Sequence, residues 1–147
     1  MNPGFEDGLT DWMIVRDFNM SHSAKEAARL GNLGLRLTDE DPEKGSGLQS
    51  LPVAGEGGKT YELSFWMRLV SGAGRVTVQM RPFNEAMKAT SKKQIKLNAT
   101  PTSEWKRYSI KRKLPEEALQ LAVRISSANK SVLTVDIDDV ECREVIE

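Results

Sequence analysis

The stretch that decides the fold is Thr60–Val70, TYELSFWMRLV, because its side chains alternate strictly between two faces. One face takes the bulky apolar residues Tyr61, Leu63, Phe65, Met67 and Leu69. The other face takes Glu62, Ser64, Trp66 and Arg68. A period of two residues is typical of a β-strand with one buried side. The sequence therefore predicts a strand here, with Tyr61 and Phe65 in the core.

Turn-forming segments flank this strand on both sides. GEGGK (55–59) precedes it and SGAG (71–74) follows it. The second turn is short enough to lead into a hairpin with a strand over Arg75–Phe83. That partner would direct Val76, Val78 and Met80 to the core, and Arg75, Thr77, Gln79 and Arg81 outward. We therefore expect a central hairpin with one polar outer face.

The same alternation recurs along the rest of the chain. It predicts strands over Trp12–Asp17, Gly34–Thr38, Gly47–Val53, Trp105–Lys113, Leu119–Ser126 and Val132–Val140. The strand over Leu119–Ser126 would direct four side chains to the core: Leu119, Leu121, Val123 and Ile125. SAKEAAR (23–29) has too few apolar positions for more than a single helical turn or an irregular loop, and the basic stretch Lys88–Lys96 is expected to be a solvated loop or an edge strand. About eight short strands separated by turns are typical of an all-β, antiparallel sandwich of jelly-roll type.

Composition limits the classes of function. The 147 residues suit a single domain spanning 1–147. With 29% charged residues the chain is too polar for insertion into a membrane, and with 21 basic and 21 acidic residues it has no net charge to attract nucleic acid. Cys142 is the only cysteine, which excludes an internal disulfide and leaves too few thiolates for a structural zinc site.

Four segments occur in an order that resembles a known family. They are NPGFEDGLTDW (2–12), GKTYELSFWMRL (58–69), SEWKRYSI (103–110) and VDIDDVE (135–141). Together they resemble the carbohydrate-binding modules of the family 4, 9 and 22 group over nearly the whole chain. The resemblance implies a galactose-binding-like jelly roll that binds polysaccharide without catalysis. Such a module would be monomeric, would act beside an attached catalytic domain, and would neither bind nucleic acid nor insert into a membrane.

The start of the chain bears on its origin. MNPGFEDGLTDW is polar and rich in turn residues, whereas a signal peptide needs a basic start and an apolar run. We therefore expect Met1 to be a start placed before a domain cut from a larger multidomain protein. The function implied by the resemblance then sets the expected location, which is extracellular or at the cell surface, secreted as part of that protein.

The resemblance also implies a structural calcium ion. In the modules that this chain resembles, Ca²⁺ is held by the glutamate of the GFE start, the first aspartate of the closing DD pair and nearby carbonyls. The matching positions are Glu6 and Asp138, with carbonyls near Asn2 and Gly31. If the first and last strands are neighbours, the two carboxylates can converge into the hard oxygen site that calcium favours. The alternative is that these acids only cap turns or accept backbone hydrogen bonds.

A sugar site needs aromatic faces beside planar polar side chains. The outer face of the expected hairpin offers this mixture, with help from a later strand, in Trp66, Arg68, Gln79, Arg81, Phe83 and Arg124. Two alternatives stay open: Trp66 packs under a loop, and the arginines pair with acids such as Glu62. Trp12 and Trp105 are assigned to the core or the rim of a sheet.

The loop Thr38–Gly47 carries no aromatic residue, whereas xylan-binding relatives carry a tryptophan there. A xylan-type platform is therefore disfavoured. An arginine-rich face would suit an acidic glycan instead, through charge-assisted pairing.

Two other classes of function compete with the carbohydrate module. Enzyme activity is disfavoured because His22 is the only histidine, lies in a polar loop and has no cysteine close to it in the sequence, so that Cys–His or Ser–His–Asp catalysis has at most one possible base. A structural or protein-binding sandwich of a cell-surface or secreted protein remains the alternative. A flat, broadly apolar outer face would favour that alternative, and a hollowed polar face with exposed aromatics would favour sugar binding.

Overall fold

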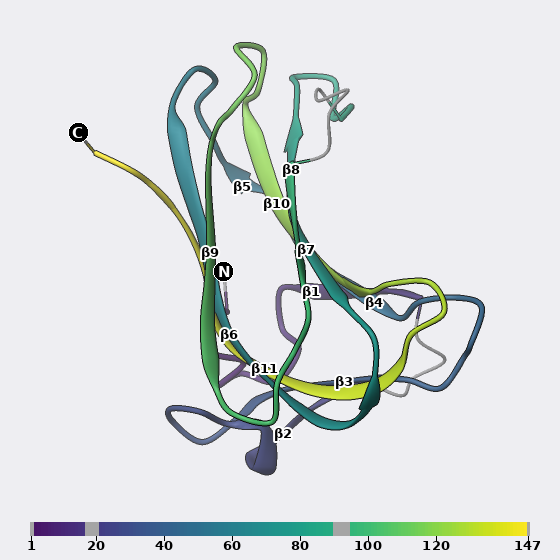
Figure 1. The fold of residues 1–147 in the computed structure, drawn as a ribbon. Helices are drawn as coiled ribbons and strands as arrows, with labels where there is room; N and C mark the ends of the chain where they lie inside the picture. Colours follow the sequence, from purple (N-terminus) through teal and green to yellow (C-terminus); the bar gives the residue numbers. More distant parts are fainter. Residues whose placement is uncertain (1, 17–20, 90–94, 147) are drawn as a thin grey trace.

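The computed structural model describes residues 2–16, 21–89 and 95–146 and shows two antiparallel sheets packed as a sandwich (Figure 1). The β7 sheet has the order β1 (Trp12–Arg16), β4 (Gly47–Ser50), β10 (Gln120–Ser127), β7 (Val76–Phe83) and β8 (Ile95–Ala99), with β5 (Val53–Ala54) also paired to β10. The β6 sheet has the order β2 (His22–Ala24), β3 (Gly34–Asp39), β11 (Val132–Glu144), β6 (Thr60–Ala73) and β9 (Lys106–Lys113). The all-β jelly-roll sandwich is thus confirmed.

The core lies between the sheets and is built from the inward half of each alternating strand. Buried side chains from β6 are Tyr61, Leu63, Phe65 and Met67, and they meet Val76, Val78 and Met80 of β7 and Leu121, Val123 and Ile125 of β10. The predicted inward sets of these three strands are confirmed except for Leu119. That residue lies just before β10, where its side chain is 53% exposed.

The predicted hairpin is wrong, because β6 and β7 belong to different sheets. Strand β6 continues to Ala73, which pairs with Val132 of β11, and the chain then crosses to the other sheet. Gly72 and Gly74 permit this crossing. A Cβ on Gly72 (φ 82°) would lie 2.2 Å from the Val132 carbonyl oxygen, and one on Gly74 would lie 2.3 Å from Ser131 Oγ. The glycines that suggest a hairpin turn instead allow a close approach to the start of β11.

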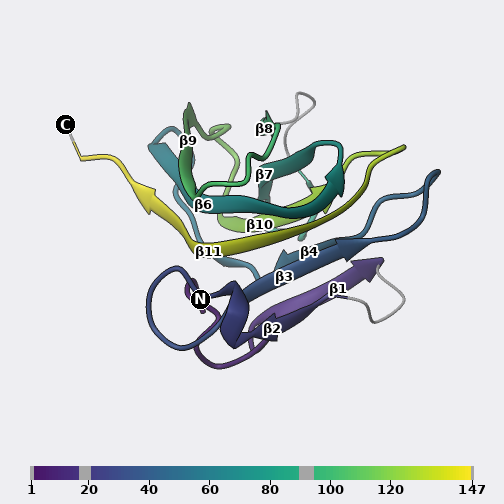
Figure 2. The ribbon, with the colours of Figure 1, turned by 60° about the horizontal axis from the view of Figure 1, so that its bottom comes forward.

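The remaining segments follow the sequence predictions closely. The helix-like patch forms only the 3₁₀ turn η1 (Lys25–Ala27). Residues 90–94 of the basic stretch lie outside the described residues, and its last two residues begin β8, an edge strand. Strands β11, β3 and β2 lie side by side on the near side of Figure 2. The described chain contains no helix long and apolar enough to span a membrane.

Candidate functional site

A row of outward side chains crosses all five main strands of the β7 sheet. Directly opposed residues join Met13 to Gln49, Gln49 to Arg124, Arg124 to Gln79 and Gln79 to Lys96. Opposed residues in an antiparallel pair project from the same face. Their neighbours along β7, Val78 and Met80, are buried, so this row faces away from the core. We call these five residues the cross-sheet row.

Arg81 extends this polar surface. It lies opposite Ala122 of β10, yet its Nη1 donates a 2.8 Å hydrogen bond to Oε1 of Gln49 on β4. The side chain therefore reaches across β10, which explains why Ala122 is fully buried on a face that is otherwise open. The Arg81 guanidinium carbon also lies 5.8 Å from the ring centroid of Phe83.

Arg124 sits at the centre of the row, half-buried between two glutamines. Burial lowers the pKa of Arg124, and the positive charge of Arg81 lowers it further. Both effects disfavour the charged form of the guanidinium. It nevertheless remains protonated at neutral pH, because the ordinary pKa of arginine is far above 7. The face thus holds two mutually repelling cations whose remaining N–H donors are available to a ligand.

An open pocket of about 290 Å³ lies beside the middle of the row, at Arg124 and Gln79. It is lined by Val15, Gly45, Ser46, Gly47, Gln79, Arg124, Ser126, Ser127 and Asn129. Amide, hydroxyl and guanidinium groups therefore converge on a hollow with little apolar surface. Such a set of donors and acceptors suits a polyhydroxylated ligand.

A buried hydrogen-bond network fixes the floor of this pocket. Ser127 Oγ donates to Asp39 Oδ2 at 2.6 Å and accepts from the Ser46 amide at 2.7 Å. Asp39 is only 1% exposed. Strand β3 in the other sheet thereby holds the segment Gly45–Gly47 against β10, so the pocket is preformed.

Trp66 lies on the opposite side of the sandwich, on the outer face of the β6 sheet. The Arg29 guanidinium carbon lies 3.4 Å from the centroid of the Trp66 ring. The structure thus separates Trp66 and Arg68 from Gln79, Arg81 and Phe83, which share the β7 sheet with Arg124. The six predicted ligand-binding residues form two groups on different faces.

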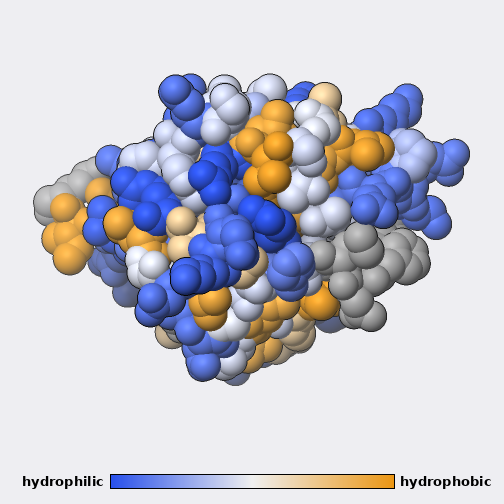
Figure 3. Space-filling view, turned by 90° about the horizontal axis from the view of Figure 1, so that it is seen from below, coloured by the Kyte–Doolittle hydropathy of each residue, from blue (hydrophilic) through white to orange (hydrophobic). Residues whose placement is uncertain are grey.

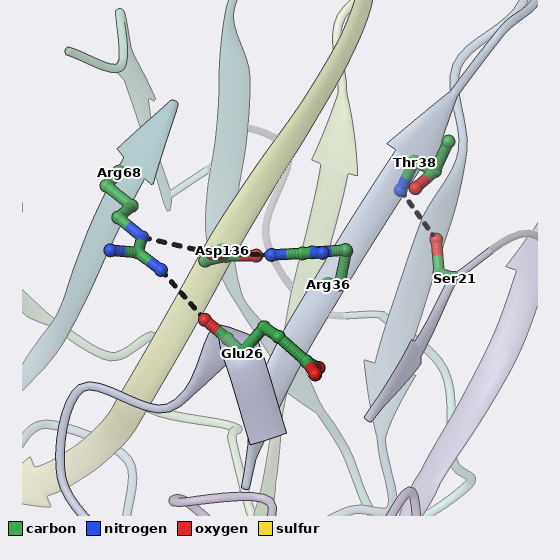
Figure 4. A network of polar contacts seen from close by, with 6 residues as sticks. All are labelled: Ser21, Glu26, Arg36, Thr38, Arg68 and Asp136. Atoms are coloured by element: carbon green, nitrogen blue, oxygen red, sulfur yellow. Dashed lines mark hydrogen bonds and ion pairs between the residues drawn. The ribbon is translucent and has the colours of Figure 1, made fainter. Parts of the chain in front are cut away.

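Arg68 belongs to an ion network on that second face (Figure 4). Asp136, fully buried, accepts from Arg68 Nε at 3.0 Å and from Arg36 Nε at 2.9 Å. Arg68 Nη2 also donates to the Glu26 carbonyl at 2.8 Å. Its guanidinium carbon lies 4.9 Å from the ring centroid of Trp105, which is half-buried there and does not enter the core. These contacts tie η1 to the sheet and use the Nε and Nη2 donors of Arg68.

The hydropathy of this side of the molecule is mixed. Viewed from below Figure 1, where β2 and β3 lie, the surface shows hydrophilic residues at the centre with scattered hydrophobic areas (Figure 3). No broad apolar area covers the face seen there, among the described residues. This side of the molecule therefore lacks, among the described residues, the flat apolar surface that a protein-packing role would favour.

The predicted calcium ligands converge around the N-terminal turn. Glu6 accepts hydrogen bonds from the Asn32 and Leu33 amides at 3.0 and 3.1 Å. Asp138, fully buried, accepts from the amides of Arg29 at 2.8 Å and Leu30 at 3.1 Å. The first and last strands are not neighbours, contrary to the geometry assumed from sequence; the turn docks instead, because the Val140 amide donates to the Pro3 carbonyl at 2.9 Å.

Asn2, Gly4 and Gly31 complete this region. Asn2 Nδ2 donates to the Gly8 carbonyl, and the Asn2 carbonyl accepts from Trp12 Nε1 at 3.1 Å. A Cβ on Gly4 would lie 3.7 Å from Glu6 Cγ and 3.8 Å from Asp138 Oδ1, so the turn brings the two acids together. Gly31 has φ 74°, and a Cβ there would lie 2.2 Å from Glu6 Oε1. Glycine is therefore required where the loop meets the carboxylate.

The acidic side chains of this region are partly removed from solvent. Burial raises the pKa of Asp138, although three backbone amides oppose the shift. Burial also raises the pKa of Asp139, whose Oδ2 accepts no hydrogen bond among the described residues but lies 3.7 Å from Nη1 of Arg29. No cluster of three or more His, Cys, Asp or Glu side chains in the described chain has metal-binding geometry. A metal here would therefore need backbone carbonyls beside the two carboxylates, which is the donor set that calcium accepts.

Cys142 offers no nucleophile. Its Sγ lies 3.6 Å from Met80 Sδ, and burial raises the pKa of the thiol to about 12. The group is therefore protonated at neutral pH, whereas nucleophilic attack requires the thiolate.

Comparison with a protein family gives the first independent indication of function. The family CBM_4_9, described as a carbohydrate binding domain, matches residues 1–131. No curated protein matches the chain.

Solved structures share the fold across the whole chain. One titled Family 16 Carbohydrate Binding Module-2 has a TM-score of 0.76 and 21% identity, covering 98% of both chains. TmCBM61 in complex with β-1,4-galactotriose has a TM-score of 0.71 and 18% identity, covering 98% of this chain and 96% of that one.

A third structure contains a similar domain joined to another one. It is the CBM22-1-GH10 modules of Clostridium thermocellum endo-1,4-β-D-xylanase 10B complexed with xylohexaose. The TM-score is 0.70 at 18% identity, covering 97% of this chain and 28% of that one. Likeness at such identities establishes the fold alone.

Proposed function

The chain belongs to the CBM_4_9 family of carbohydrate binding domains, and we propose that it holds its glycan on the outer face of the β7 sheet. The observation that carries this location is the cross-sheet row, which is in register over five strands and borders a preformed polar pocket at Arg124 and Gln79. A linear polymer needs such an extended surface, because several of its sugar units must be contacted together.

Binding requires only that the row replace the water around sugar hydroxyls. The amides of Gln49 and Gln79 can each donate and accept, and the guanidinium of Arg124 only donates. Exposed parts of Met13 and Phe83 offer apolar contact to the C–H surfaces of a sugar ring. The domain binds carbohydrate and carries out no chemistry on it, so an ordered set of donors and acceptors is sufficient.

The domain would target an attached enzyme to its polysaccharide substrate. Support comes from the xylanase described above, in which a domain of this fold is joined to a GH10 module. Because the polysaccharide substrates of such enzymes lie outside cells, we propose that the parent protein is extracellular or anchored at the cell surface.

We also propose a structural calcium ion at Glu6 and Asp138. Carbonyls near Asn2 and Gly31 would supply the remaining oxygens. The convergence of Glu6 and Asp138 at the Gly4 turn supports a cation there, as does the buried Asp139 Oδ2, which accepts no hydrogen bond among the described residues. Bound calcium would neutralise the carboxylates and thereby fix the N-terminal turn against the end of β11.

Affinity electrophoresis through gels that contain single polysaccharides tests the function. We expect at least one polymer from a broad panel to slow the wild-type domain, and a Gln49→Ala/Gln79→Ala variant to lose that retardation. Ser109→Ala serves as the matched control, because Ser109 is exposed on β9 in the other sheet. Unretarded migration of the folded wild type through the whole panel would favour the structural or protein-binding alternative instead.

A further inference from the structure

Acidic residues are distributed unequally between the two sheets. The strands of the β7 sheet contain no aspartate or glutamate, although they carry Arg16, Arg81, Lys96 and Arg124. The strands of the β6 sheet contain Asp39, Glu62, Asp136, Asp138, Asp139, Glu141 and Glu144. The strands of the β7 sheet therefore carry positive charges that no acidic residue of the same strands compensates, although the whole chain has no net charge.

The ion pairs follow the same division. Among the described residues, Arg36, Arg68, Arg107 and Arg143 each have a carboxylate within 4 Å on the β6 sheet. Arg81 and Arg124 have none in the described part of the chain, and Arg81 instead bonds the neutral amide of Gln49. The charges of Arg81 and Arg124 are thus not neutralised by a carboxylate in the described part of the chain, as is also true of the exposed Arg112 on β9.

Placing these two arginines together has an electrostatic cost. They lie on adjacent strands, with Arg81 directed across β10, and the charge of Arg81 lowers the pKa of Arg124. An anion bound between them would reverse that repulsion and form charge-assisted hydrogen bonds, which are about twice as strong as neutral ones.

Aromatic stacking cannot replace this contribution on the same face. Phe83 is the one outward aromatic side chain in the described β7-sheet strands, since Trp12 is buried. A face with one phenylalanine therefore offers little aromatic area for stacking on a sugar ring, whereas its two arginines, which have no carboxylate partner, can bind an anionic group.

We infer that the glycan held on the β7 sheet is anionic, and that Arg81 and Arg124 bind its carboxylate or sulfate groups. This inference rests on the proposed function and names the substrate class for the same face. Lys96, exposed at the far end of the row, would contribute a third positive charge along the polymer.

Isothermal titration calorimetry with paired polymers tests the inference. The pairs are polygalacturonate with its carboxyl-reduced form, and a sulfated galactan with its desulfated form. We expect the wild type to bind one charged member at least tenfold more tightly than its neutral counterpart; which pair responds distinguishes carboxylate from sulfate. Equal or tighter binding of the neutral members would overturn the inference while leaving carbohydrate binding intact.

Variants then locate the charge. Arg124→Gln should weaken binding of the anionic polymer at least tenfold, and Arg124→Lys should recover part of it. Arg112→Gln, which removes an exposed arginine from β9, should change the affinity less than twofold. Equal losses for Arg124→Gln and Arg112→Gln would indicate nonspecific attraction and overturn the inference. Binding of no polymer, charged or neutral, would overturn the proposed function as well.

Discussion

The Arg29 guanidinium lies 3.4 Å above the centroid of the Trp66 ring, on the sheet opposite the cross-sheet row. The tryptophan is therefore covered by a residue of the same chain. This is the packing alternative that the sequence leaves open, since a ring stacked under a guanidinium has no free face on that side. The contact joins the loop after η1 to β6 and gives Trp66 a structural role.

Replacement of Trp66 tests that role. Trp66→Ala should lower the free energy of unfolding by about 1–3 kcal/mol, because it removes a cation–π contact and part of a large packed surface. Glycan affinity should stay within twofold of the wild type in the folded variant. Chemical denaturation and calorimetry measure the two quantities, and Trp66→Phe, which retains a ring beneath Arg29, is the control. Loss of glycan binding at unchanged stability would contradict the assignment.

Among the carboxylates of the β6 sheet, we expect Asp136 to lower the free energy of unfolding most when it is substituted. It is fully buried between Arg36 and Arg68, so Asp136→Asn leaves two guanidinium groups without a counter-ion. We expect a loss of about 3 kcal/mol in unfolding free energy, as for other broken buried pairs. Glu62→Gln is the comparison. Its partners Arg107, Lys111 and Arg143 are exposed, so the loss there should stay below about 1 kcal/mol.

The acidic end of β11 predicts an unusual pH dependence. Because burial raises the pKa of Asp139, the folded state binds a proton more tightly than the unfolded state does. In the presence of a chelator, the wild type should therefore gain stability from this group as the pH falls through the raised pKa, until the gain is complete below the ordinary value of 3.8.

Asp139→Asn isolates this effect. Asp139 has φ 51°, a conformation that asparagine also tolerates, so the substitution removes the charge without new strain. The variant should be more stable than the wild type near pH 7, and the difference should shrink on acidification. Denaturation curves at several pH values measure it; a difference that grows as the pH falls would show the opposite linkage.

Calcium should stabilise the domain. At about one hundred times the dissociation constant, linkage adds about 3 kcal/mol, which corresponds to a rise of about 5–10 °C in the melting temperature. Glu6→Gln should abolish most of the rise, whereas Glu117→Gln, an exposed glutamate in a distant turn, should retain it. An identical melting temperature of the wild type with calcium and with chelator would refute the proposed ion.

Sequence patterns predict the strands well but not the sheet to which each belongs. The alternation in Thr60–Val70 and in Val76–Met80 correctly separates core from surface, because burial acts on each residue locally. A short link with two glycines is compatible with a hairpin or with a crossing between sheets. Whether the chain turns back or crosses depends on contacts of Gly72 and Gly74 with the start of β11, about sixty residues later in the chain. A pattern of neighbouring residues contains no information about such a distant contact.

The candidate site was accordingly predicted in part. Gln79, Arg81, Phe83 and Arg124 do share a face, while Trp66 and Arg68 lie on the other sheet. Gln49 and Lys96 were missed, although the alternation around Leu48 already directs Gln49 outward. Their membership of the row depends on strand order, which only the fold supplies.

Chemical-shift mapping by NMR shows directly whether the glycan binds on the outer face of the β7 sheet. The domain is titrated with an oligosaccharide prepared from a polymer that it binds, and backbone amides and arginine Nε–H groups are followed. We expect shifts concentrated on β4, β10 and β7, with the largest at Gln49, Arg124 and Gln79. Shifts confined to the β6 sheet around Trp66 and Arg68 would contradict this location.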